Sequence, residues 1–212
     1  MKLIKCISDF KVDHNKIRNY YYTKCKVSEL LIDLLKKEKK EDFVNLALGI
    51  SNPIGNIRAN EHNLGPSILK LNPIENIYDL ALQVFTKKLS PNALMKVIYQ
   101  TNLSYFKVSI GSEMSSMLCP NRYWYCNIRS VWAHLLIKYD GDAAKLNLDI
   151  DNVENSPSEL NYSTWRKIYP DIGISLNDIY EVTTPLRVKE EIYADENKYL
   201  WIDAVCNAMY ES

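Results

Sequence analysis

The spacing of apolar positions along the chain favours helices over most of its length. Apolar residues recur every three or four positions over 27–35, ahead of a run of lysines that suits a helix C-terminus. Asn72 and Ser90 are expected to cap two further helices, because each is followed by a proline, suited to the first turn, and by an apolar repeat. The helices predicted in this way cover 27–48, 73–85, 91–105, 120–140 and 193–209, and Ser156 to Glu159 should cap another.

Other segments do not follow the helical spacing. Residues 3–12 and 145–150 alternate apolar and polar positions, which predicts short β-strands. Residues 49–72 are rich in glycine and proline, which predicts a long loop where a lid could form. The expected fold class is therefore mainly α: a helical bundle core domain over 1–140, with a small mixed α/β acidic C-terminal extension over 141–212 packed on it.

Charge is distributed unevenly, although the net charge is zero. Residues 1–40 hold eleven Lys and Arg against five Asp and Glu, whereas residues 140–212 hold six against fifteen. A basic face can hold a phosphate backbone, and an acidic segment can repel one or face a partner protein. Two solvated faces of a neutral protein would give the same distribution, so charge alone identifies no ligand.

Several function classes lack their sequence signatures. The five cysteines are odd in number and never form a CxxC pair, which fits unpaired thiols in a reducing compartment and disfavours a zinc site. Phosphate-binding glycine motifs and the calcium-binding EF-hand spacing are also missing from the sequence. From these missing signatures we expect no metal and no cofactor. Neither a membrane-length apolar run nor a signal peptide is found, so we also expect no membrane contact and a cytoplasmic location in a bacterial or phage-infected cell.

The candidate chemistry lies in residues 123–136, which read as one amphipathic helix carrying Arg129 and His134. Five positions along a helix correspond to a rotation of about 140°, so the two side chains lie on adjoining faces. Two such helices crossing at a dimer two-fold would bring two arginines and two histidines into one groove. Histidine can take the proton of a ribose 2′-hydroxyl while a guanidinium stabilises charge on the phosphorane, with no metal. DNA, which lacks that hydroxyl, would not be cleaved.

Arg129, Ser130 and His134 resemble the Arg-polar-x-x-x-His motif of the HEPN superfamily, which includes metal-independent RNases of phage defence and toxin–antitoxin systems. The resemblance implies an all-α homodimer with facing motif helices, an endoribonuclease activity and 2′,3′-cyclic phosphate products. It implies that Arg129 and His134 are catalytic and that Ser130 and Asn127 support them. Two departures are the serine after the arginine, where Asn, His or Asp is commoner, and the apolar residues in place of a downstream basic run.

Other residues could contact RNA, namely Arg18, Lys24 and Tyr125, because basic and aromatic side chains together suit a nucleic-acid surface. Each candidate also has a structural interpretation, since aromatic residues and a satisfied histidine are common in a core. The alternative hypothesis is a non-catalytic interaction protein, such as a phage-encoded inhibitor or an immunity or antitoxin-like partner. In that case the acidic region 140–212 binds a basic surface or mimics nucleic acid.

Overall fold

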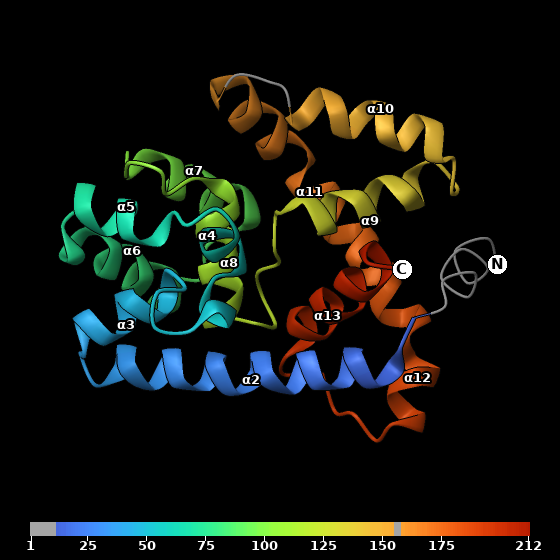
Figure 1. Ribbon diagram of the computed structural model, residues 1–212, viewed down its shortest axis with the longest axis horizontal. Coiled ribbons are helices and arrows are strands. Elements are labelled where there is room, and N and C mark those ends of the chain that lie inside the picture. The colour runs from blue at the N-terminus through green and yellow to red at the C-terminus, as the bar shows by residue number, and fades with distance from the viewer. Residues whose placement is uncertain (1–11, 155–157) are drawn as a thin grey trace. The chain divides into compact units, whose positions relative to one another are not determined.

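The computed structural model describes residues 12–154 and 158–212, and every regular element in those ranges is a helix (Figure 1). The prediction of a mainly α fold is therefore confirmed. The strand predicted over 3–12 falls outside the described residues, apart from Val12. The described residues also include no helix with the length and apolar character needed to cross a membrane.

The strand predicted over 145–150 is wrong, because these residues lie inside helix α10 (Ala143–Glu154). Asp142 starts this helix: its side chain accepts a hydrogen bond from the backbone nitrogen of Lys145 at 3.2 Å. Of the alternating leucines, Leu146 is buried but Leu148 is 64% exposed, so the alternation does not mark one face of a sheet. The described part of the acidic extension is helical and not mixed α/β.

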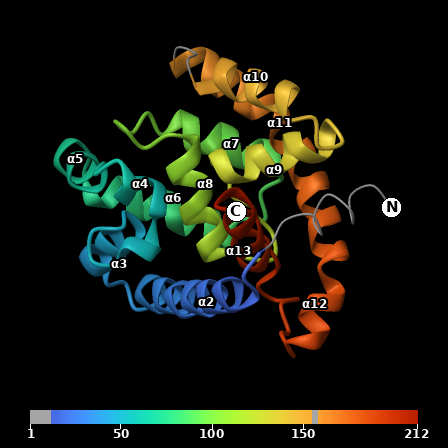
Figure 2. The same cartoon turned by 45° about the vertical axis from the view of Figure 1, so that its right-hand side comes forward.

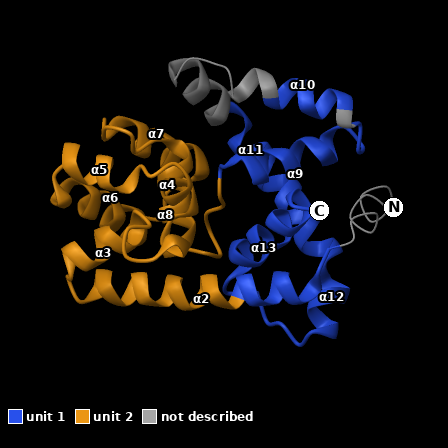
Figure 3. Cartoon of the chain, in the orientation of Figure 1, with its two compact units in different colours: residues 1–21, 126–212 blue, residues 22–125 orange. Residues whose placement is uncertain are grey.

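The chain forms two compact units, shown in different colours in Figure 3. The middle unit comprises residues 22–125, and the terminal unit combines residues 1–21 with 126–212. Their boundaries fall at residues 21 and 125, whereas the prediction was a core domain over 1–140 and an extension over 141–212. Helix α2 (His14–Lys36) begins in the terminal unit and continues into the middle unit.

The middle unit is built around helices α6 and α8. Besides part of α2, its elements are α3 (Lys40–Ala47), η1 (Pro53–Gly55), α4 (Ile57–Glu61), α5 (Gly65–Leu71), α6 (Ile74–Thr86), α7 (Pro91–Gln100) and α8 (Val108–Leu118). Helix α6 packs against α3, α7 and α8, and α8 also packs against α4 and α7. A Cβ added to Gly111 would lie 2.6 Å from a methyl carbon of Ile98, so this glycine allows α7 and α8 to approach closely.

The long loop predicted over 49–72 is wrong, since η1, α4 and α5 occupy most of it. Asn56 explains the local order. Its Oδ1 accepts a hydrogen bond from Ala59 N at 3.0 Å and so caps α4, while its amide donates to the carbonyls of Ala47 and Ile110, both at 3.1 Å. The segment is therefore fixed by buried hydrogen bonds that the glycine and proline content did not indicate.

The terminal unit is centred on α9 (Ile128–Lys138), which packs against α10, α11 (Ser158–Val182) and α13 (Lys198–Tyr210). Helix α13 lies beside α9 in both ribbon views (Figures 1 and 2). The short helix α12 (Thr184–Lys189) follows α11. The first turns of α2 belong to this unit, because the Tyr20 hydroxyl donates to Asp203 at 2.9 Å and the Tyr21 ring meets Trp201 edge-on.

Candidate functional site

The aromatic residues ahead of the motif are not helical, which corrects the prediction of one helix over 123–136. Helix α9 begins at Ile128, and residues 123–127 form a buried, irregular segment. Tyr123 explains the difference: its hydroxyl oxygen accepts a hydrogen bond from Leu89 N at 3.1 Å and lies 3.2 Å from the Leu89 carbonyl. Satisfying this buried phenol fixes the segment outside the helix.

Asn127 and Ser130, the expected supporting residues, form the capping box that starts α9. Ser130 N donates to the Asn127 side chain at 3.1 Å, and Asn127 N donates to the Ser130 hydroxyl at 3.1 Å. Both residues are buried. Their polar groups therefore satisfy the free backbone nitrogens of the helix start, which is a structural task.

His134 is only 7% exposed and lies in the packed part of α9. Its Nδ1 is 2.9 Å from the hydroxyl of Ser175 on α11. Burial lowers the pKa of His134 from its ordinary value of 6.5, Lys138 lowers it further, and Asp171 opposes both effects. The imidazole is therefore predominantly neutral at pH 7 and is held in one orientation.

Arg129 lies in the first turn of the same helix and is half-buried. The structure thus places Arg129 and His134 on one helix at different depths, with the arginine nearer the surface. A substrate phosphate could approach Arg129 more readily than the imidazole. Chemistry at His134 would need α11 or α13 to move, since α9 packs against both helices.

Of the three residues proposed to contact RNA, only Arg18 reaches the surface. Its side chain is 42% exposed and forms an ion pair with Glu190 at 3.4 Å. Lys24 and Tyr125 are buried in the middle unit, where the lysine Nζ lies 4.9 Å from the centre of the tyrosine ring. In this structure, therefore, neither Lys24 nor Tyr125 is available to a ligand at the surface.

Lys24 instead forms a buried ion pair with Glu113 of α8, with 2.8 Å between Nζ and Oε1. The Glu113 carboxylate also accepts hydrogen bonds from Ile57 N at 3.0 Å and Arg58 N at 3.2 Å, at the start of α4. The pair joins residues 89 positions apart, so no local pattern could have revealed it. This cluster links α2, α4 and α8 and is a structural centre of the middle unit.

The residues that sequence reasoning missed include an exposed face of α11. Asp171, Ile174, Asp178 and Glu181 are all exposed, and their spacing puts them along one side of the helix. We call these four residues the α11 acidic face. Ile174 is 62% exposed within it. The acidic composition of residues 140–212 was the available signal, but the helical register was needed to recognise the face.

A metal centre is not evident in the described ranges, where no group of three or more His, Cys, Asp or Glu side chains could hold an ion. Comparisons with protein-family models, curated proteins and solved structures found no match to this chain. Functional conclusions therefore depend on the residues described above.

Proposed function

We propose that this protein is a non-catalytic interaction protein, comparable to a phage-encoded inhibitor or an immunity or antitoxin-like partner, and that the α11 acidic face binds a basic protein surface. The observation that carries the proposal is this face: three carboxylates surround an isoleucine that is 62% exposed. An apolar anchor within a charged rim is a common arrangement for protein binding.

The placement of the motif residues supports a role without catalysis. His134 is buried against Ser175, and Asn127 and Ser130 are used to start α9. A general base must come within hydrogen-bonding distance of the proton that it removes, which a buried imidazole does not do without a conformational change. The side chains of Asn127, Ser130 and His134 already have structural partners in the terminal unit.

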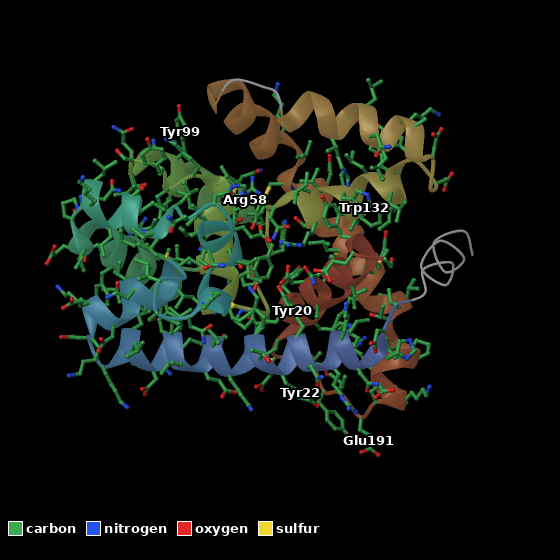
Figure 4. The ribbon with its side chains drawn as sticks, in the orientation of Figure 1. Tyr20, Tyr22, Arg58, Tyr99, Trp132 and Glu191 are labelled. Carbon is green, nitrogen blue, oxygen red and sulfur yellow. The ribbon has the colours of Figure 1, made fainter. Side chains whose placement is uncertain are left out.

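The charge of the terminal unit defines the chemistry of the partner. This unit contains thirteen Lys and Arg against seventeen Asp and Glu. Glu191, after α12, is exposed and points away from the ribbon (Figure 4). A net negative surface speeds the association of a positively charged partner, while Ile174 supplies apolar contact after docking.

The proposal can be tested with a fluorescent amphipathic peptide of lysine and leucine at helical spacing. We expect wild-type protein to bind it and both Asp178→Lys and Ile174→Ser to weaken binding by about tenfold. The matched control is Glu29→Lys, which changes an exposed carboxylate of the middle unit and should leave binding unchanged. Absence of wild-type binding, or equal weakening by Glu29→Lys, would contradict the proposal.

A HEPN-type endoribonuclease is the second candidate, with RNA as substrate and a homodimer as the active form. The specific observation in its favour is that Ser175 orients His134 on the helix that also carries Arg129, where burial lowers the pKa of the imidazole. Neutral imidazole is the form required of a general base. In an RNase, a movement of the helices would expose the imidazole. His134 would then take the proton of the ribose 2′-hydroxyl, and Arg129 would stabilise the charge on the phosphorane.

Incubation with total RNA and tRNA in EDTA separates the two candidates. Cleavage by wild type and by His62→Ala, but not by His134→Ala, would establish the RNase if the products carry cyclic phosphates. His62 is an exposed histidine in the middle unit and is the matched control. Intact RNA in all three reactions, from proteins with equal thermal stability, is the result expected of the interaction protein.

A further inference from the structure

The middle unit has a long stretch without negative charge. Residues 80–112 include four lysines and no Asp or Glu. These lysines, Lys87, Lys88, Lys96 and Lys107, are all exposed. The next carboxylate, Glu113, is buried and paired with Lys24. The surface made by this stretch is therefore positive, with no carboxylate of its own to offset it.

The connection between α7 and α8 presents an aromatic ring on this stretch. Leu103 and Phe106 are 4% and 1% exposed and anchor the connection in the core. Ser104 is held from both sides by Asn72, with Ser104 N donating to Oδ1 at 2.8 Å and the amide donating to the Ser104 carbonyl at 3.0 Å. Tyr105, between the anchors, is 54% exposed.

Tyr105 adopts an unusual backbone conformation for a bulky residue, with φ of 61°. Such a conformation is unfavourable for a residue with a Cβ and persists only where neighbouring contacts impose it. Here the buried side chains on either side and the Asn72 hydrogen bonds impose it. The ring is thus presented outward by a fixed segment, which reduces the entropy lost when a ligand stacks on it.

Helix α7 adds a second aromatic residue and a lysine. Lys96 and Tyr99 are one turn apart on its exposed side, and Tyr99 is 45% exposed. The Tyr99 side chain extends away from the ribbon (Figure 4). Lys107 lies two positions after Tyr105, immediately before α8. Along α7 and the connection that follows it, two exposed tyrosines therefore lie between two exposed lysines.

From this arrangement we infer that α7 and residues 101–107 form a binding surface for single-stranded nucleic acid. Tyrosine rings stack on unpaired bases of any sequence, and lysines neutralise the phosphates between them. Bases in a duplex are already stacked on one another, so a duplex should bind less well. The inference does not depend on the proposed function, because the α11 acidic face belongs to the other unit.

The test measures binding of fluorescent U-rich RNA and T-rich DNA single strands to the full chain by anisotropy at 50 mM and 200 mM salt. Wild type should bind single strands more tightly than the matching duplex, and tightness should fall with salt. Tyr105→Asn removes the ring but suits the left-handed backbone, so it should weaken binding by about tenfold without loss of fold. Tyr105→Phe should bind like wild type, because it keeps the ring.

Tyr193→Ala is the matched control, since Tyr193 is 89% exposed on the acidic terminal unit. It should bind like wild type. Affinity falls as salt rises, so the slope of log affinity against log salt is negative. Lys107→Ala should make this slope shallower by about 0.7, the value for one phosphate contact. Preference for RNA over DNA would show contact with the 2′-hydroxyl. Equal binding would show that the surface contacts only bases and phosphates. Either result supports the inference.

Any of the following results would overturn the inference: no wild-type binding at 50 mM salt, wild-type affinity in Tyr105→Asn, equal weakening in Tyr193→Ala, or equally tight binding of the duplex. Polyglutamate serves as a competitor that has charge but no bases. Displacement by polyglutamate at the same charge concentration would show that the surface binds any polyanion, which also overturns it.

Discussion

Lys24 is a buried ammonium that forms an ion pair with the carboxylate of Glu113. The pair with Glu113 is 0% and 1% exposed, and Glu113 also holds the first turn of α4. Removing two charges from water is unfavourable unless hydrogen bonds and opposite charge compensate for the lost solvation. The middle unit should therefore be far more sensitive to loss of one partner than to loss of both charges.

Glu113→Gln removes the carboxylate that pairs with the buried Lys24 ammonium, and we expect the free energy of unfolding to fall by about 3–5 kcal/mol. Lys24→Met combined with Glu113→Gln should recover part of that loss, because no charge remains and glutamine still accepts a backbone hydrogen bond. Urea unfolding measures both. Lys37→Ala, which breaks an exposed pair with Asp33, should change stability by less than about 1 kcal/mol. A Glu113→Gln loss no larger than this would show that the buried pair has little influence.

His134 should make stability depend on pH. Burial lowers its pKa below 6.5, so the unfolded chain binds a proton more readily than the folded chain. This contribution to stability is present above pH 6.5 and is lost as pH falls through the lowered folded-state pKa. Urea unfolding at pH 7.5, 6.5 and 5.5 should show a steeper loss for wild type than for His134→Gln, which can still bond to Ser175. Parallel curves would exclude His134 as the cause.

Capping interactions are the decisive features at the scale of elements. Asn127 starts α9 through its bond with Ser130 N. Asn127→Ala should lower the free energy of unfolding by about 1 kcal/mol, because it leaves a buried backbone nitrogen without an acceptor. Asn127→Asp keeps the acceptor and suits the positive end of the helix dipole, so it should be nearly neutral. The two variants are compared by urea unfolding, and equal losses would rule out capping as the role of Asn127.

Elements with strong local signals could be predicted from the sequence. Helix α6 lies where apolar spacing placed it, and Ser90 caps α7 as expected. Helix α7 ends at Gln100 and not at residue 105, and α13 begins at Lys198 and not at residue 193. Asn72 was expected to cap α6, but its side chain bonds to Ser104 instead. This error and the loop wrongly predicted over 49–72 have the same cause. A side chain whose partner lies far along the chain takes a role that its neighbouring residues do not indicate.

Helix α8 shows the same limit. Its serines and Gly111 are weak helix formers, so the local sequence pattern did not indicate this helix. Small residues are nevertheless what close packing against α7 requires, as the contact of Gly111 with Ile98 shows. The surroundings of His134 could not be predicted for the same reason, because Ser175 lies 41 positions away and no local pattern links the two residues.

For the whole molecule, charge follows the two units and not the order of the sequence. The middle unit holds thirteen Lys and Arg against nine Asp and Glu, the reverse in sign of the terminal unit. The basic first residues belong to the terminal unit, together with the acidic C-terminal helices. The uneven distribution of charge is visible in the sequence. The contacts between helices are needed to show which charged residues belong to which unit.

Thiol chemistry offers a test of packing across the chain. Burial raises the pKa of Cys119, Cys126 and Cys206, which suppresses the reactive thiolate. We expect these three residues to resist iodoacetamide at pH 8 in the native protein and to react within minutes in 6 M urea. Site-resolved mass spectrometry provides the measurement. Rapid native labelling of any of the three would show local opening of the helices around it.

The division of the terminal unit into two chain segments has a consequence for synthesis. Tyr21 meets Trp201, and Tyr20 meets Asp203, only after the whole of residues 22–125 has been made. Because the ribosome extends a chain from its N-terminus, the middle unit can assemble while both tyrosines still await α13. Pulse proteolysis of stalled nascent chains should therefore find residues 22–125 protected first. The first unit to begin emerging would be the last to be completed.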